Sequence, residues 1–388
     1  MTQAQVQAQV EAFKAGLDGI IAGESKICLI DGENRKLSYR GYNVADLAKN
    51  STFEETTYLL LKGKLPTKKE LEQFNADLLK ARYIPTQILA MIALVPPHTH
   101  PMDVLRTIVS ALSQHEPEVD DNSEAANFRK ATKLISQAPV IVSAYHRLRQ
   151  GLQPIPPLKK LSLAANFLYM LTGEEPDSYS QEVFDDCMIL HADHCFNAST
   201  FTARVTAATL SDLHSAITAA IGALKGKLHG GANQEVMELL SKIGTVENAV
   251  PFIEKMFEKG EKVPGFGHRV YRTCEDPRAT ILREASRELG KKENNTKWFD
   301  ISTEVEKHVL KTSQEKNKPI YPNVDFYSAS TYSVLGIEPQ LFTPIFAMSR
   351  LSGWCAHVIE QHSNNRLIRP QAHYIGEKDL TYSDISKR

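Results

Sequence analysis

Residues 67–79, TKKELEQFNADLL, show how this chain folds. They open with Thr67-Lys68-Lys69-Glu70, a capping box in which the threonine hydroxyl accepts from the backbone N–H three residues on and the glutamate reaches back. Apolar residues then recur at the three- and four-residue spacing that places side chains on one helical face: Leu71, Phe74, Leu78 and Leu79. The stretch therefore predicts an amphipathic α-helix that begins after Thr67.

The same periodicity continues along the chain. Two further stripes predict helices with one buried face each: Leu213, Ile217, Ile221 and Leu224, and then Val236, Leu239, Leu240 and Ile243. Strand signals are few. Ile27 and Leu29 alternate before Asp31-Gly32, and Leu37 and Tyr39 follow, which predicts a small β-hairpin around a turn. We therefore expect an all-α protein with a small N-terminal β-hairpin.

Composition excludes several classes of protein. The 388 residues carry 45 basic and 46 acidic side chains, a balance that suggests neither nucleic-acid binding nor attraction to an anionic membrane. The five cysteines are scattered and form no Cys-x-x-Cys pair, so we expect neither a disulfide framework nor a structural zinc site. No apolar run approaches the roughly 20 residues that span a bilayer. A soluble, cytoplasmic protein is the expectation.

Four segments are rich in histidine, arginine, asparagine or aspartate, and three of them also contain glycine or proline, which suits a site built between helices. They are LHADHCFN (190–197), GKLHGGAN (226–233), PGFGHRVYR (264–272) leading to Asp276-Pro277-Arg278, and PNVDFYS (322–328).

His229 and His268 both lie next to glycines, where the backbone can bend sharply. His229 precedes a Gly-Gly pair and a helix expected near Asn233, whose free N–H groups would favour a neutral imidazole. An ordinary loop histidine is the alternative. His268 follows Gly-Phe-Gly and precedes Arg269, Arg272 and Arg278, whose planar guanidinium groups match carboxylate and phosphate oxygens; a solvated basic surface is the alternative.

Two further positions have competing interpretations. His191 and His194 share a helical face and could hold one metal ion, but no further ligands are evident nearby, so hydrogen bonding of His194 to an anionic ligand is preferred. Asp325 lies among aromatic and aliphatic side chains, where desolvation would raise its proton affinity and suit a general base. A helix N-cap aspartate is the alternative.

Together these segments resemble the citrate synthase family. LHGGANQEV is similar to its first histidine motif, GFGHRVYR with DPRA to its second, and NVDFYS to its catalytic aspartate segment. HADHCFNAST and the C-terminal FTPIFAMSRLSGWCAHVIEQ with NRLIRP are also similar to family segments, so the resemblance runs from about residue 25 to about residue 376.

The resemblance implies roles for individual residues. His229 would stabilise the enolate of acetyl-CoA, Asp325 would remove the methyl proton, and His268 would protonate the oxaloacetate carbonyl. The implied oxaloacetate-binding residues are His194, His268, Arg278, Arg350 and Arg369, with Arg369 supplied by the partner subunit of a homodimer. Arg272 and Lys318 would bind CoA. No metal and no cofactor besides the co-substrate acetyl-CoA are implied.

The family's two-domain helical fold implies a large domain of residues 1–229 and 334–388 and a small domain of residues 230–333 that closes over the site. The alternatives are a 2-methylcitrate synthase that uses propionyl-CoA, a catalytically silent helical interaction protein, and a metalloenzyme built on His191 and His194. Higher oligomers than the dimer remain open. The chain has one residue more than the family usually has between His268 and Asp276, within Arg272-Thr273-Cys274-Glu275.

Overall fold

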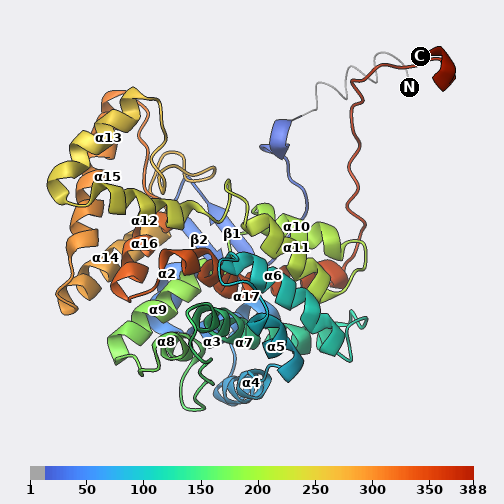
Figure 1. The fold of residues 1–388 in the computed structure, drawn as a ribbon, viewed down its shortest axis with the longest axis horizontal. Coiled ribbons are helices and arrows are strands. Elements are labelled where there is room, and N and C mark those ends of the chain that lie inside the picture. The colour runs from blue at the N-terminus through green and yellow to red at the C-terminus, as the bar shows by residue number, and fades with distance from the viewer. Residues whose placement is uncertain (1–13) are drawn as a thin grey trace. The chain divides into compact units, whose positions relative to one another are not determined.

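A computed structural model describes residues 14–388 and confirms the all-α class (Figure 1). The earlier α-helices are α2 (Val44–Asn50), α3 (Phe53–Lys62), α4 (Lys68–Ala81), α5 (Thr86–Ala93), α6 (Pro101–Leu112), α7 (Glu124–Arg149), α8 (Leu163–Thr172), α9 (Ser178–His191), α10 (Ala198–Ala207) and α11 (Leu213–Leu224). The later ones are α12 (Ala232–Ile243), α13 (Ala249–Glu258), α14 (Pro277–Lys292), α15 (Lys297–Glu315), α16 (Val324–Val334) and α17 (Phe342–Ser363). Short 3-10 turns are η1 (Ala15–Leu17), η2 (Ser113–His115), η3 (Val246–Asn248), η4 (Pro339–Leu341) and η5 (Ile385–Lys387).

Contacts divide the chain into two compact units. One is Ser25–Arg366, which contains α2 to α17 and the strands. In the described part of the chain, the other comprises residues 14–24 and Leu367–Arg388. This division does not test the predicted boundaries at residues 229 and 333, which stay a prediction. No helix in the described part of the chain is both long enough and apolar enough to cross a membrane.

Helix α17 forms the centre of the larger unit. It packs against α3, α7, α9, α10 and α11, and Figure 1 shows it surrounded by other helices. Trp354 on this helix is fully buried and Arg350 is only 1% exposed. A helix buried on all sides holds its side chains in fixed directions because close-packed neighbours leave few rotamers. Arg350 is therefore a fixed charge in the interior.

The helices marked by periodicity form as predicted. In α4, the Thr67 hydroxyl accepts from the Glu70 N–H, and the Thr67 N–H donates to the Glu70 carboxylate at 2.8 Å, which completes the capping box. Phe74 and Leu78 are the buried members of that helix. All four stripe residues of α11 and all four of α12 are buried.

The predicted hairpin is part of a three-stranded antiparallel sheet. Strand β1 (Cys28–Asp31) pairs with β2 (Lys36–Tyr39), and a short third strand, β3 (Tyr42–Asn43), was not predicted. Leu37 and Tyr39 are fully buried, whereas Leu29 is 62% exposed. The Tyr39 hydroxyl donates to the carbonyl groups at the end of α9 and accepts from the Asp193 N–H at 3.3 Å. The sheet thus holds the turn that carries His194.

Candidate active site

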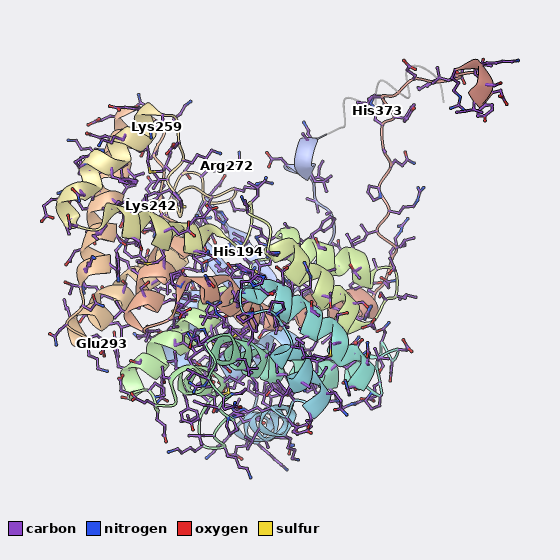
Figure 2. All side chains as sticks on the ribbon, viewed as in Figure 1. His194, Lys242, Lys259, Arg272, Glu293 and His373 are labelled. Carbon is purple, nitrogen blue, oxygen red and sulfur yellow. The ribbon has the colours of Figure 1, made fainter. Side chains whose placement is uncertain are left out.

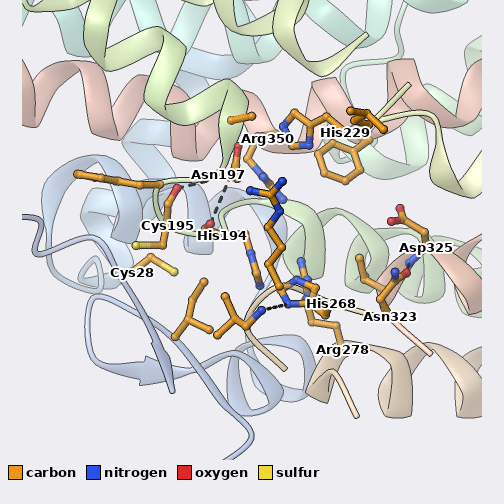
Figure 3. A pocket seen from close by; sticks show the side chains of 18 of the residues that line it. Cys28, His194, Cys195, Asn197, His229, His268, Arg278, Asn323, Asp325 and Arg350 are labelled. Atoms are coloured by element: carbon orange, nitrogen blue, oxygen red, sulfur yellow. Dashed lines mark hydrogen bonds between the residues drawn. The ribbon is translucent and has the colours of Figure 1, made fainter. Parts of the chain in front are cut away.

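One cavity of about 870 Å³ brings together parts of all four segments that the sequence singled out (Figure 3). Its size lies in the range of small-molecule sites. Six of the predicted site residues line it: His194, His229, His268, Arg278, Asp325 and Arg350. The rest of the wall includes Leu29 of β1, Asn197 at the start of α10 and Phe346 of α17. Residues separated by more than 150 positions therefore share one site.

Backbone geometry places His229 at the start of α12, as predicted. A β-carbon on Gly230 would lie 2.4 Å from the Leu224 carbonyl oxygen, so only glycine permits this close turn after α11. Helix α12 begins at Ala232. Burial of the ring, together with the charge of Arg350, lowers the pKa of His229 to about 4. The imidazole is therefore neutral at neutral pH.

Ser199 decides which nitrogen of His229 carries the proton. The Ser199 N–H donates to His229 Nε2 at 3.2 Å, and the Ser199 hydroxyl lies 2.8 Å from the same nitrogen. A ring nitrogen that accepts a hydrogen bond is unprotonated in neutral imidazole, so the proton is on Nδ1. No acceptor for Nδ1 is found among residues 14–388. His229 therefore offers an N–H donor to a ligand in the cavity.

The Ser199 hydroxyl is itself held by two groups. The Trp354 indole N–H donates to it at 3.1 Å, and Asn197 Oδ1 lies 2.8 Å from it as a second acceptor for its proton beside His229 Nε2. Asn197 is also the N-cap of α10. Because Ser199 and Trp354 are both fully buried, this arrangement keeps His229 in one orientation.

His268 has the opposite proton arrangement. Its Nδ1 accepts from the Val270 N–H at 2.9 Å and from the Tyr271 N–H at 3.2 Å, so Nε2 carries the proton. Burial and the charge of Arg278 lower the pKa of His268 to about 4, against the raising effect of Asp276. His268 is thus a second neutral N–H donor. Its ring lies 5.1 Å from the ring of His194, centre to centre.

The site's histidines do not form a convincing metal centre. Among residues 14–388 one group of potential ligands lies close together, namely His194, His268 and Asp276. A metal ion bound at His268 Nε2 would displace the proton of that nitrogen. Because Nδ1 accepts hydrogen bonds from two backbone N–H groups and is also unprotonated, the ring would become an anion. Asp276 is occupied by Arg278, which contacts both of its carboxylate oxygens, at 3.0 and 2.7 Å. His191 lies outside this group, with Nδ1 2.7 Å from the Cys187 carbonyl.

Two buried guanidinium groups lie at this end of the cavity, and only Arg350 lacks a carboxylate partner among the residues that the structure describes. Arg278 is 2% exposed and paired with Asp276, at the start of α14. Arg350 donates to the His191 carbonyl at 2.6 Å, and no carboxylate lies within salt-bridge distance of it in the described part of the chain. Burial lowers the pKa of His194, with Arg278 as the next cause, so the His194 imidazole is neutral. A buried cation without a partner favours an anionic ligand.

Asp325 places a carboxylate in the cavity wall. It lies in the first turn of α16, and Asn323 rather than Asp325 is the N-cap, since the Asn323 side chain accepts from the Asp325 N–H at 3.0 Å. The N-cap alternative for Asp325 is therefore wrong. Burial raises the pKa of Asp325 to about 6, against the lowering effect of Arg278. Figure 3 shows its carboxylate across the cavity from Arg350.

Two predicted site residues do not line the cavity. Arg272 and Lys318 are exposed and lie outside its wall. Arg369 is also exposed and belongs to the separate unit that contains the C-terminal segment. Their assignments to CoA and to oxaloacetate of a partner subunit stay predictions.

Two contributors were missed at the level of sequence. Ser199 lies within HADHCFNAST, but no local pattern predicts its contact with a residue 30 positions later. Asp276 is recognisable as the N-cap before Pro277, yet its pairing with Arg278 needs the folded turn.

Comparisons with known proteins agree with this geometry. The family model described as "Citrate synthase, C-terminal domain" matches residues 16–371. "Citrate synthase 2" of Bacillus subtilis (strain 168) is 49% identical over 374 residues, 96% of this chain and 98% of that protein. "Citrate/2-methylcitrate synthase" of the same strain is 41% identical over 371 residues, with coverages of 96% and 98%. A solved ternary complex of citrate synthase from Thermoplasma acidophilum with carboxymethyl coenzyme A and oxaloacetate has a TM-score of 0.90 at 31% identity, covering 97% of this chain and 99% of that one.

Fold, cavity and matches together define a helical acyltransferase. Because the family model covers nearly the whole chain and relatives reach 49% identity over almost their full length, the chain belongs to the citrate synthase family. The resemblance, the fold and the enzyme class predicted from the sequence are confirmed.

Proposed function

We propose that this protein is a citrate synthase: it condenses acetyl-CoA with oxaloacetate and hydrolyses the resulting citryl-CoA to citrate and CoA. The observation that carries the proposal is the cavity itself. It combines two neutral imidazoles that present N–H donors, a desolvated carboxylate and two buried guanidinium groups. Those are the groups that an enolate condensation with a dicarboxylate requires.

The first step is proton transfer. The methyl protons of a thioester are far less acidic than a carboxylic acid. A carboxylate base therefore removes one only if another group stabilises the carbanion that forms. Asp325, with its pKa raised to about 6, removes the proton, while His229 Nδ1–H donates to the thioester oxygen, on which negative charge develops. A neutral donor suits this role because it stabilises the enolate without giving up its proton.

Condensation follows when the enolate carbon attacks the ketone carbon of oxaloacetate. The carbon–carbon bond forms, the carbonyl oxygen becomes an alkoxide, and His268 Nε2–H donates to it and supplies the proton. The proton that Asp325 took from the methyl group then restores the neutral His268 ring. Arg278, Arg350 and His194 would bind and orient the two carboxylates of oxaloacetate. Water then attacks the thioester carbon of citryl-CoA, and CoA leaves as the thiol. This sequence needs no metal and no redox cofactor.

Further parts of the proposal rest on the family resemblance. Arg272 and Lys318 would contact CoA phosphates, and closure of the small domain would keep water out until condensation is complete. Arg369 would reach the oxaloacetate of the partner subunit in a homodimer. The ternary complex of the Thermoplasma acidophilum relative supports the pair of substrates proposed here.

A 2-methylcitrate synthase is the second candidate. A relative whose name gives both activities is 41% identical, and one extra methylene changes preference by only about 1–3 kcal/mol in an apolar pocket. The two differ in acyl-CoA and share the mechanism.

Release of free CoA by the purified protein tests both candidates. Acetyl-CoA and propionyl-CoA are each supplied with and without oxaloacetate. Oxaloacetate-dependent release that is faster with acetyl-CoA supports citrate synthase, and the reverse order supports 2-methylcitrate synthase. No oxaloacetate-dependent release with either thioester would refute the proposed function and favour a catalytically silent protein.

A further inference from the structure

The turn of the N-terminal hairpin touches the segment that carries His268 and Arg278. Residues 32–35 join β1 to β2, and residues 268–278 run from the second histidine motif into α14. The two lie about 240 positions apart in sequence. They include residues 272–275, where the resemblance to the family implies one residue more than usual.

Gly32 makes the closest backbone approach between them. A β-carbon on Gly32 would lie 2.6 Å from the Val270 carbonyl oxygen and 2.9 Å from a Val270 methyl carbon. The Gly32 backbone is not in the left-handed region, so this neighbour is what excludes a side chain. The Cys274 thiol donates to the Gly32 carbonyl at 2.9 Å. The hairpin turn and residues 270–274 are therefore in tight contact.

Arg35 adds an ionic contact at the same place. Its guanidinium donates to the Glu275 carboxylate at 3.2 Å, to the Glu275 carbonyl at 3.3 Å and to the Thr280 hydroxyl at 3.1 Å. The Arg35 side chain is 46% exposed, whereas that of Glu275 is 13% exposed. Three hydrogen bonds from one guanidinium fix the turn more firmly than a single surface ion pair does.

The interactions of Glu275 continue toward the helix that carries Asp325, the proposed base. Glu275 also pairs with Arg283 of α14, and Arg283 pairs with Glu306 of α15. Glu306 in turn accepts from the hydroxyl of Tyr327 on α16, two residues after Asp325. One continuous set of ion pairs and hydrogen bonds thus joins the hairpin turn to the helix that carries Asp325.

We propose that Arg35 and Glu275 form a latch that holds the His268–Arg278 segment against the hairpin when the predicted small domain is closed, so that His268 and Arg278 face the cavity. Both are positioning residues, because they act through the segment and do not line the cavity. Three strand residues on the same hairpin, Cys28, Leu29 and Ile30, do line the cavity, so the latch fixes two facing parts of its wall relative to each other. The role in turnover rests on the proposed function.

The test is a double-mutant cycle of Arg35→Ala, Glu275→Gln and the two combined. Each single change raises the KM for oxaloacetate about threefold to tenfold, with kcat within about twofold, because the binding segment must be ordered when substrate arrives. The KM of the double variant equals that of each single variant, because either change alone already breaks the contact and the two effects do not add. Gly32→Ala, which forces the turn away from Val270, raises the same KM without touching the ion pair.

Arg287→Ala is the matched control. Arg287 is 44% exposed, lies on α14 and pairs with Glu284 and Glu288, away from the hairpin. The KM of the Arg287→Ala variant for oxaloacetate therefore stays at the wild-type value. A lower melting temperature with unchanged KM in the Arg35 and Glu275 variants would overturn the latch and leave only a structural ion pair.

Amide hydrogen exchange gives a readout that is independent of activity. Exchange of residues 268–276 accelerates in Arg35→Ala and not in Arg287→Ala. If wild-type protein released no CoA but this exchange difference were present, the proposed function would fail and the latch would stand. If turnover were normal but the exchange of residues 268–276 were unchanged, the latch would fail alone.

Discussion

Replacing Asp325 with asparagine should abolish condensation and at the same time stabilise the fold at neutral pH. Burial raises the pKa of this carboxyl from 3.8 to about 6, so the ionised form costs stability in the folded state. Each pKa unit is worth about 1.4 kcal/mol, which gives at most about 3 kcal/mol at pH 7.5. Because the carboxylate reaches the cavity, where water screens it, we expect a gain of about 1–3 kcal/mol.

The sign and the pH window follow from the two pKa values. Above about pH 6 the group is ionised in both folded and unfolded states, and the whole cost is present. As the pH falls toward 3.8, the folded protein binds the proton first, and the cost shrinks to about 0.5 kcal/mol at pH 4. Asparagine has no charge to desolvate, so the stability that Asp325→Asn gains over the wild type must also shrink as the pH falls.

Thermal unfolding of the wild type and Asp325→Asn at pH 7.5 and pH 4 measures this. For a chain of 388 residues the gain corresponds to a rise in Tm of about 1–4 °C at pH 7.5. Asp46→Asn is the matched control, because Asp46 lies in the first turn of α2 behind another asparagine N-cap but is exposed; it should lower stability by less than about 1 kcal/mol. An Asp325→Asn protein that is no more stable than wild type at pH 7.5 would refute the claim that the Asp325 carboxylate is desolvated at a cost in stability.

Four further outcomes are expected. The kcat/KM should fall about tenfold per pH unit below about pH 6, as Asp325 takes up a proton; a flat profile to pH 5 would contradict its role as base. Ser199→Ala should lower kcat about 5- to 30-fold with little change in substrate affinity, because it frees the ring of His229; an unchanged kcat would show that the hydroxyl is dispensable. Arg350→Lys should weaken oxaloacetate binding about 10- to 100-fold by calorimetry, since lysine lacks the planar fork, and equal affinity would remove Arg350 from the site. Arg369→Ala should also weaken oxaloacetate binding, and heterodimers formed with His229→Ala should regain activity if the partner completes the site; no recovery would argue against sharing.

The sequence by itself determined the fold class and most of the site. Helical periodicity predicted α4, α11 and α12, because burying one face of each helix requires that spacing. The resemblance of ordered motifs to the citrate synthase family predicted His229, His268 and Asp325 as the catalytic residues, and all three line one cavity. Local patterns suffice for the helices because each is encoded within a few neighbouring residues, whereas the site residues were predicted from the family resemblance.

Only the tertiary structure decided the protonation and the electrostatics. The proton of His229 is placed by Ser199, 30 residues earlier, and the pKa of Asp325 depends on burial by distant helices. The contact between Arg35 and Glu275 spans 240 residues and has no local pattern. Proton positions, desolvation and contacts between remote segments depend on which atoms meet in space, and that is set by the packing of the whole chain.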